Sequence, residues 1–422
     1  MYDQSFNLKT ISRELRKSDF TYKPRLRDKV VKDYELNTAL SKASGGWDVA
    51  KGLFVSQVRG KFVYRSASFS DELILRKLNR NLVENAKLRG TNRDYIVANI
   101  KEVLREGVEY RVYRLDIKSF YESICVARAI KLLDSLVLMS QPTKKHIKAL
   151  LEFHAASGKT GVPRGLALSA TIAEIVMQDF DNSIKELDGV FYYGRYVDDI
   201  IVVTDRLELP YRFIRLVKQA LPYGLCLNTK KQMICETIGD VAPHKATSPP
   251  VQELDFEYLG YRFLVASPVR NNKKRDGQHF RDVRLDIATS KLKKIKTRIV
   301  RSLIGFNSDG DFELLRSRIK FLASNFSVMD ADRDRKRLAG IFYNYHRIDS
   351  ARSNGLQELD LYLTKIVSSG FGKVSDEFYS KTTLSQRREL LVISFRKGFV
   401  NKIFLHFSNS RLGKIQGCWK YV

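Results

Sequence analysis

Only one Asp-Asp pair occurs in this chain, Asp198 and Asp199, in the segment FYYGRYVDDIIVVT at 191–204. Adjacent carboxylates repel each other, and Asp is a poor strand former, yet the runs on both sides have the composition of buried strands. A hairpin tip tolerates such residues because it interrupts the hydrogen-bond ladder. The segment therefore predicts two short strands that meet at an acidic turn. By itself, the pair indicates either an exposed turn or a metal site.

A third carboxylate ends another predicted strand upstream, Asp116 in YRLDIKSFYESI. Three carboxylates at the ends of adjacent strands are able to hold two divalent cations, and bound cations remove the repulsion between neighbouring aspartates. A site of this kind activates an attacking oxygen and neutralises charge on a leaving group. The combination of the three residues favours a two-metal site over a plain turn.

The charge of the chain points to a polyanionic partner. Its 422 residues include 74 Lys+Arg against 47 Asp+Glu, a formal net charge of +27. Each contact between a basic side chain and a phosphate releases a condensed counterion, which favours nucleic-acid binding. A solvated basic surface is the alternative, although solubility needs a net charge of only about 2–8 for a small domain.

Several features argue against a membrane or secreted protein. No run of about 18 apolar residues exists, and the first 20 residues lack the apolar core of a secretory signal. The four cysteines are scattered without CxxC spacing, which argues against structural zinc and against a disulfide framework. We therefore expect a cytoplasmic protein with no membrane partner.

The order of the predicted elements indicates an α+β fold. Helical spacing over 70–106 precedes a strand at 110–117, and a Gly/Pro-rich loop at 156–165 precedes a long helix. The acidic strand pair, a helix near 208–221 and a further strand or hairpin follow, which predicts a sheet with helices on one face. Residues 270–347 carry 20 Lys+Arg against 9 Asp+Glu and predict a basic, all-helical module with helices at 289–304 and 311–326.

Six segments, in matching order along the chain, resemble the motifs of reverse transcriptases. YVDD in GRYVDDIIVV is similar to the catalytic signature, and LDIKSFYESI is similar to the metal-binding motif before it. GVPRGLALSATIAEI resembles the loop and helix that contact template and nucleotide, and GLCLNTKKQ resembles the motif with a lysine near the incoming nucleotide. FEYLGYRF resembles the primer-grip hairpin, and the basic helical segment after it occupies the thumb position.

The resemblance covers roughly residues 70–330 and implies a right-hand polymerase fold, in which fingers and palm share an antiparallel sheet and a helical thumb and a C-terminal extension follow. It implies an RNA-directed DNA polymerase that adds dNTPs by two-metal nucleotidyl transfer. The implied divisions are an N-terminal extension at 1–69, fingers and palm at 70–267, a basic helical thumb at 268–347 and a C-terminal extension at 348–422.

The resemblance also assigns roles to residues of the centre. Asp116, Asp198 and Asp199 are implied as catalytic ligands of two Mg²⁺ ions, with Mn²⁺ able to substitute, and the carbonyl of Ile117 is implied as a further ligand. Tyr121 occupies the position of the steric gate that excludes a 2′-hydroxyl. Phe120 competes for that role, and a core aromatic is the structural alternative for Tyr121.

Further implied contacts lie around this centre. Lys231 matches the lysine that faces the departing pyrophosphate, with Lys230 as an alternative, and a surface lysine is the structural explanation. The remaining residues assigned to nucleotide binding are Arg164, Gly165, Arg80 and Arg93. The implied primer grip is Tyr258, Leu259 and Gly260, and the implied nucleic-acid surface of the thumb is Lys291, Lys293, Lys294, Lys296 and Arg298.

Two departures narrow the resemblance. The loop motif usually has glutamine where this chain has Arg164, and a helix-opening Ser-Pro is replaced by Ser169 and Ala170. With GTNRDYIV, IKFLASNFSV and LAGIFYNYHRID, these departures are similar to bacterial defence-associated reverse transcriptases of the unknown group, in particular to the A-type polymerase subunit of the class 3 systems.

That resemblance implies antiphage defence, a noncoding RNA template, a DNA product, a companion reverse transcriptase subunit and a hetero- or homo-oligomer. Template-independent or protein-primed DNA synthesis on the same fold is the alternative, and a catalytically silent RNA-binding scaffold is a second. The aromatic, basic tail FVNKIFLHFSNSRLGKIQGCWKYV predicts either a packed C-terminal helix or an RNA grip.

Overall fold

The computed structural model describes residues 2–88, 90, 92–238, 251–270, 279–330, 335–368, 370 and 372–420. The chain forms two compact units. Unit 1 comprises Met1–Ile96 and Glu109–Glu236, and unit 2 comprises Val97–Val108 and Thr237–Val422. The four-part division expected from the sequence stays a prediction.

Unit 1 begins with short helices that lead into a β-hairpin. Asp28 caps the longest of these helices by accepting a hydrogen bond from the Val30 amide, as expected for Asp at this position. The hairpin pairs β1 (Leu53–Val58) with β2 (Lys61–Ser66) in antiparallel register. The preceding elements are α1 (Leu8–Ser12), α2 (Lys17–Tyr22), a 3₁₀ turn (Pro24–Arg27), α3 (Lys29–Gly45) and α4 (Val49–Gly52).

A four-stranded antiparallel sheet forms the centre of unit 1, in the order β4-β5-β3-β6. Its strands are β3 (Tyr110–Asp116), β4 (Val190–Tyr196), β5 (Asp199–Asp205) and β6 (Met233–Glu236). The predicted strand at 110–117 and the predicted acidic hairpin are therefore confirmed. β5 is so apolar because Ile200, Ile201, Val202 and Val203 are all fully buried within the unit.

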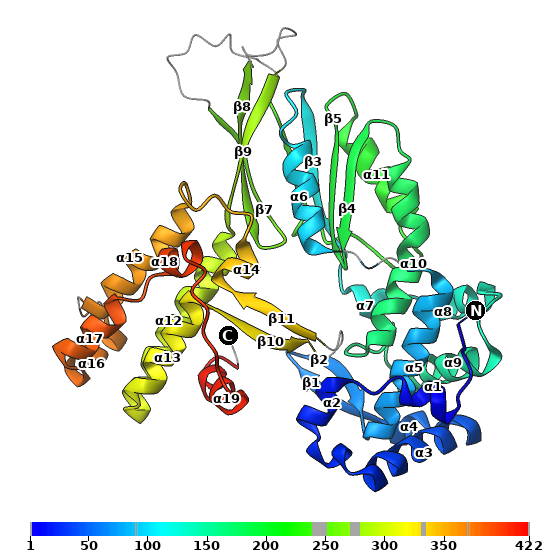
Figure 1. Cartoon of the computed structure of the whole chain (residues 1–422). Coiled ribbons are helices and arrows are strands. Elements are labelled where there is room, and N and C mark those ends of the chain that lie inside the picture. The colour runs from blue at the N-terminus through cyan, green and yellow to red at the C-terminus, as the bar shows by residue number, and fades with distance from the viewer. Residues whose placement is uncertain are drawn as a thin grey trace. The chain divides into compact units, whose positions relative to one another are not determined.

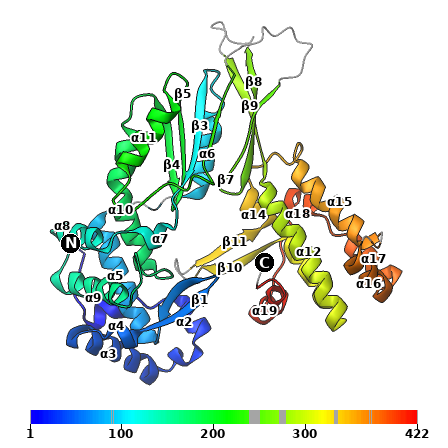
Figure 2. The same ribbon diagram turned by 180° about the vertical axis from the view of Figure 1, so that it is seen from behind.

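Helices pack against this sheet and complete the core of unit 1. The ring of Phe213 on α11 (Pro210–Ala220) lies 4.5 Å from that of Tyr113 on β3, and both views show α11 beside the sheet (Figures 1 and 2). The long helix α10 (Ala167–Lys185) contacts β4 and α5 (Phe69–Ala86). The remaining helices are α6 (Arg93–Val103), which runs from unit 1 into unit 2, α7 (Phe120–Ser123), α8 (Val126–Ser135) and α9 (Gln141–Ala156).

Unit 2 combines a sheet with helices. The strands β7 (Gln252–Tyr258), β8 (Tyr261–Arg270) and β9 (His279–Ile287) form a three-stranded antiparallel sheet. The predicted helices at 289–304 and 311–326 are present as α12 (Thr289–Asp309) and α13 (Phe312–Ala323). The expectation of an all-helical module over 270–347 is wrong, because β9 lies within it and β10 (Asn325–Asp330) pairs with β11 (Arg335–Gly340). The high charge of β9 and β11 made these two segments unlike strands in the sequence.

The C-terminal part of unit 2 is helical, and its tail is packed. Trp419 is buried, and its indole Nε1 donates to the Arg298 carbonyl at 3.0 Å. The tail thus follows the packed-helix expectation. The helices are α14 (Ile341–Tyr345), α15 (Asn354–Ser368), α16 (Lys373–Lys381), α17 (Leu384–Leu391), α18 (Phe395–Val400) and α19 (Asn409–Gly417). Throughout the described ranges, none of the helices combines the length and the apolar character needed to cross a membrane.

Candidate active site

The turn between β4 and β5 presents the acidic pair at one end of the sheet. Tyr196 and Asp199 form the last strand pair, so Val197 and Asp198 make up a two-residue turn. Val197 has φ +61°, in a region that a β-branched residue rarely adopts. Backbone strain of this kind requires the surrounding structure to hold it in place.

The three predicted carboxylates come together at this end of the sheet. Asp116 is the direct cross-strand partner of Asp199 in the β3–β5 register, so the two side chains project on the same face. The amide of Ile117 donates to the Asp198 carbonyl at 3.1 Å, which attaches the turn to the end of β3. The register thus assembles residues that are far apart in sequence.

Asp116 is held by the segment before β6. Its two carboxylate oxygens accept hydrogen bonds from Asn228 Nδ2 at 2.9 Å and Lys231 Nζ at 2.8 Å. The backbone docks as well, because the Asn228 amide donates to the Asp116 carbonyl at 2.7 Å. The structure therefore places the predicted Lys231 against the predicted Asp116. Asn228 was missed as a site residue, although it belongs to the LNTK sequence that drew attention to the lysine.

The local charges act on one another. Burial and the Asp198 charge raise the pKa of Asp199, and Asp116 adds to this effect. The hydrogen bond to Asp116 raises the pKa of Lys231, and the charges of all three aspartates reinforce it. The site is therefore an electrostatic cluster of three carboxylates and one ammonium group.

The donor set suits a hard divalent cation, since it offers carboxylate and carbonyl oxygens only. Among the residues that the structure describes, no group of three or more His, Cys, Asp or Glu side chains is arranged to hold a metal ion. In the structure, Lys231 and Asn228 donate to the two carboxylate oxygens of Asp116. The ammonium of Lys231 supplies positive charge at the position where carboxylates attract a cation.

Arg195, on β4, was missed by sequence reasoning and supports the strained turn. Its guanidinium is almost fully buried and donates to the Val197 carbonyl at 2.9 Å. It also donates to both carboxylate oxygens of Glu174 and of Asp181, at 2.7–3.0 Å. These interactions connect α10 to the turn that carries Asp198. An arginine within an otherwise uncharged strand was the available signal.

Tyr121 and Phe120 have different environments after the end of β3. Phe120 is buried, whereas Tyr121 is partly exposed. Burial raises the pKa of the Tyr121 hydroxyl, and the charges of Glu174 and Asp198 reinforce this effect. Tyr121 thus lies within electrostatic range of the acidic turn and is the more exposed of the two rings.

The Gly/Pro-rich loop at 156–165 packs against the same region. The Val162 amide donates to the Tyr121 carbonyl at 2.9 Å, and the Tyr64 amide on β2 donates to the Arg164 carbonyl at 2.8 Å. Gly161 has φ +78°, and a Cβ atom there would lie 2.1 Å from the Tyr121 carbonyl oxygen. At Gly165, with φ +102°, a Cβ atom would lie 2.6 Å from the Tyr64 carbonyl oxygen. Only glycine allows these close approaches.

Comparison with known families now identifies this part of the chain. Residues 69–263 match the family model described as reverse transcriptase (RNA-dependent DNA polymerase). The match makes residues 69–263 similar to reverse transcriptases over a little less than half of the chain. The chain is accordingly an enzyme, an RNA-directed DNA polymerase of the nucleotidyltransferase class, whose template is RNA and whose product is DNA. Reverse transcriptases use divalent metal ions, as the oxygen donors at the acidic turn allow.

No curated protein matches the sequence. Among solved structures, a telomerase from Candida albicans, in complex with a TWJ fragment of telomeric RNA, is similar to this chain. The similarity covers 92% of this chain and 68% of the telomerase chain, with 11% sequence identity and a TM-score of 0.32.

The predicted fingers cations differ in their contacts. Arg80 is about half exposed and lies 3.5 Å from Glu14, and Arg93 opens α6 and is partly exposed. Two further cations of this segment are structural: Arg76 binds Asp19 in a two-pronged ion pair, and Lys77 is buried and donates to the Asp3 carbonyl.

In unit 2, the predicted primer-grip residues form the β7–β8 hairpin. Tyr258 and Tyr261 are the closing strand pair, so Leu259 and Gly260 make up a two-residue turn. Both turn residues have positive φ, +46° and +82°. The predicted hairpin is present.

The five predicted thumb cations all lie on α12 but fall into two groups. Lys291, Lys293 and Lys294 are exposed. Lys296 forms an ion pair with Glu358 at 2.6 Å, and the Arg298 guanidinium stacks 5.5 Å from the Trp419 ring. Burial lowers the pKa of Arg298. The first group is therefore open to solvent, whereas the second contributes to packing.

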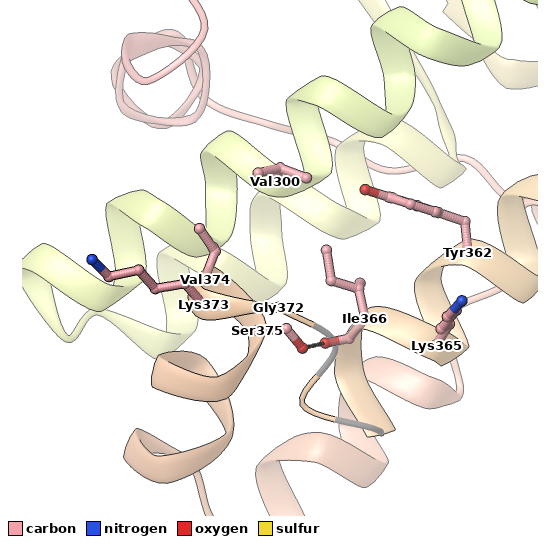
Figure 3. Close-up of a pocket in the computed structure, with 8 residues that line it drawn as sticks. All are labelled: Val300, Tyr362, Lys365, Ile366, Gly372, Lys373, Val374 and Ser375. Atoms are coloured by element: carbon pink, nitrogen blue, oxygen red, sulfur yellow. Dashed lines mark hydrogen bonds between the residues drawn. The ribbon is translucent and has the colours of Figure 1, made fainter.

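A pocket of about 350 Å³ lies within unit 2, between α12, α15 and α16 (Figure 3). Its walls include Val300, Ile366 and Val374, and Tyr362 points toward its interior. None of the predicted site residues lines it, so the pocket does not mark the polymerase centre.

Proposed function

We propose that Asp116, Asp198 and Asp199 form the catalytic centre at which this reverse transcriptase domain adds dNTPs to a growing DNA strand. The β3–β5 register carries this proposal, because it sets Asp116 directly opposite Asp199 and leaves Asp198 in the adjoining turn. The buried Arg195, which holds the turn between Tyr196 and Asp199, further supports a functional role for this end of the sheet.

The same three carboxylates, with the Ile117 carbonyl, would hold two divalent cations, and we propose Mg²⁺ with Mn²⁺ able to replace it. When bound, such ions activate the attacking 3′-hydroxyl and neutralise charge on the leaving pyrophosphate. The chain supplies the orientation: β3 and β5 fix two carboxylates, and Arg195 holds the turn that carries the third.

Neighbouring residues bind and select the nucleotide in this proposal. Tyr121 lies under the sugar and excludes a 2′-hydroxyl, since it is the accessible aromatic ring and Phe120 is buried. Gly165 lets the loop backbone approach the substrate, and Arg164 adjoins it. The Lys231 side chain is 58% exposed, so it is free to turn from Asp116 toward the departing pyrophosphate.

The nucleic acid extends beyond this centre. We assign the primer end to the turn formed by Tyr258, Leu259 and Gly260, and phosphate contacts to the three exposed lysines of α12, Lys291, Lys293 and Lys294. Lys296 and Arg298 then support α12 itself. Arg80 and Arg93 are assigned to the triphosphate.

The biological role follows from the departures at Arg164, Ser169 and Ala170. They support a cytoplasmic, bacterial, defence-associated enzyme that copies a noncoding RNA, together with a companion reverse transcriptase subunit. The class 3 antiphage systems are the subgroup that we propose for the chain.

Incubation of the purified protein with its co-purifying RNA, dNTPs and Mg²⁺ tests this function. We expect DNA complementary to the bound RNA, and we expect Asp198→Ala to slow synthesis by at least about 1,000-fold. Asp179→Asn, at an exposed position on α10, is the matched control and should not change the rate. DNA unrelated to the bound RNA would indicate template-independent synthesis. Equal synthesis by the Asp198→Ala variant would contradict the assigned centre.

A further inference from the structure

The Arg164 side chain is held by Glu122, a residue to which the sequence motifs give no role. Its Nε donates to Glu122 Oε1 at 3.0 Å, and its Nη2 donates to Glu122 Oε2 at 3.1 Å. This parallel pair of bonds uses the Nε/Nη2 edge of the guanidinium, and such pairing gives geometric specificity as well as energy. Glu122 therefore determines where the Arg164 side chain lies.

That position is directly over the proposed gate. The Arg164 guanidinium carbon lies 5.1 Å from the centre of the Tyr121 ring, within the range of a cation–π contact. Because Glu122 follows Tyr121 in sequence, one short segment supplies both the ring and the carboxylate that holds the arginine above it. The loop motif of reverse transcriptases usually has an uncharged glutamine at this position, whereas this chain places the charged Arg164 over the Tyr121 ring.

The backbone around this contact is also constrained. The Val162 amide binds the Tyr121 carbonyl, and the Tyr64 amide binds the Arg164 carbonyl. The loop on which Arg164 lies is thus attached on both sides. Lys61 on β2 approaches Glu122 at 3.4 Å and adds a second, weaker partner.

We propose that the Glu122–Arg164 ion pair is a latch that sets sugar selectivity, with Glu122 as a positioning residue for Arg164 over Tyr121. The latch holds the arginine against the ring, so that the space beside it fits a deoxyribose and not a ribose. This inference rests on the proposed function, because it takes Tyr121 as the sugar gate. Both side chains of the pair are about one-third exposed, so the latch is able to open and close as nucleotides exchange.

Kinetics of single-nucleotide addition with dTTP and UTP test the latch. Glu122→Gln and Arg164→Gln should each lower the dTTP/UTP ratio of kcat/KM by about fivefold, the size expected for a partly exposed ion pair. The double variant, Glu122→Gln with Arg164→Gln, should lower the ratio no further than either single variant, because both changes break the same ion pair. Glu109→Gln breaks a similarly exposed ion pair with Arg206, also in unit 1, and should leave the ratio unchanged.

Some outcomes overturn the latch. If Arg164→Gln changes the ratio and Glu122→Gln does not, Arg164 acts on the nucleotide without its partner. If the double variant lowers the ratio by the product of the two single effects, the two residues act independently and the ion pair is not the cause.

A second readout separates the latch from the proposed function. Equilibrium binding of dTTP and UTP needs no DNA synthesis, and the same variants should narrow the preference for dTTP. If the unmodified protein makes no DNA but shows a dTTP preference that Glu122→Gln narrows, the proposed function fails and the latch stands. If it makes DNA but Glu122→Gln behaves like Glu109→Gln in both readouts, the latch fails alone. No preference for dTTP in the unmodified protein also overturns the latch.

Discussion

The β4–β5 and β7–β8 hairpins both have a tight turn with positive φ, but different interactions stabilise the two turns. Both the β4–β5 and the β7–β8 hairpin close with a two-residue turn, and both turns contain a residue with positive φ. In the β7–β8 turn, Leu259 and Gly260 both have positive φ, a pattern for which glycine is suited. In the β4–β5 turn, Val197 alone has positive φ, and no glycine relieves it.

The difference lies in what supports each turn. Arg195 donates to the Val197 carbonyl and is itself held by two carboxylates of α10. The nearest counterpart on the other hairpin, Arg262, binds Asp255 at an exposed position. We infer that the acidic turn depends on the buried Arg195, because Val197 is a β-branched residue that rarely adopts positive φ. The β7–β8 turn contains Gly260, which adopts positive φ without such support.

Replacing each arginine by methionine is the strongest test of this difference. Arg195→Met leaves the carboxylates of Glu174 and Asp181 without their partner, and we expect a loss of about 3 kcal/mol in the stability of the β4–β5 hairpin. DNA synthesis should fall by about 100-fold or more, because the turn that carries Asp198 is released. Hydrogen exchange of the hairpin amides at increasing urea measures the stability.

Arg262→Met serves as the matched control. It removes an exposed ion pair, so the β7–β8 hairpin should lose less than about 1 kcal/mol. Equal losses in the two variants would mean that the buried network is not what distinguishes the hairpins.

Exchanging the turn chemistry gives a smaller effect. Gly260→Ala forces a Cβ atom into a backbone with φ +82° and should destabilise the β7–β8 hairpin by about 1 kcal/mol. Val197→Gly should change the stability of the β4–β5 hairpin by less, since relief of about 1–2 kcal/mol of backbone strain offsets the loss of its packed side chain. Hydrogen exchange of both hairpins checks the pair. A large gain from Val197→Gly would show that the strain is not offset.

Much of unit 1 was predictable because its patterns are local. The apolar run from Ile200 to Val203 and the carboxylates Asp116, Asp198 and Asp199 determine the sheet and its acidic end, and the structure has both. Helical spacing likewise predicted α10 in this unit, as it did α12 in unit 2.

The rest depends on partners that are distant in sequence. Arg76 and Lys77 resemble surface cations, yet Asp19 and Asp3 of the N-terminal segment draw them inward. β11, with the sequence RKRLAG, resembles a solvated charge run, and only its pairing with β10 makes it a strand. The role of Arg195 became visible only when α10 brought Glu174 against it.

The smallest expected effect comes from the charges in the acidic turn. Burial and the neighbouring Asp198 raise the pKa of Asp199 above that of the unfolded chain. The folded state therefore binds this proton more tightly, so stability rises as the pH falls through the folded pKa of Asp199, and the penalty is complete above it.

Asp198→Asn removes the neighbouring charge and should stabilise the β4–β5 hairpin by about 0.5–1 kcal/mol at pH 7.5. The gain should shrink as the pH falls from 7.5 to 4.5, because the raised pKa of Asp199 favours protonation of Asp199 in the unmodified protein in that direction. Asp255→Asn should have the opposite sign at pH 7.5, because Asp255 is attracted to Arg262 and not repelled by an aspartate. Hydrogen exchange of the two hairpins at both pH values measures these changes. If Asp198→Asn stabilises the hairpin equally at both pH values, repulsion between Asp198 and Asp199 does not explain the effect. The backbone strain at Val197 would then be the property that distinguishes the acidic turn from the β7–β8 turn.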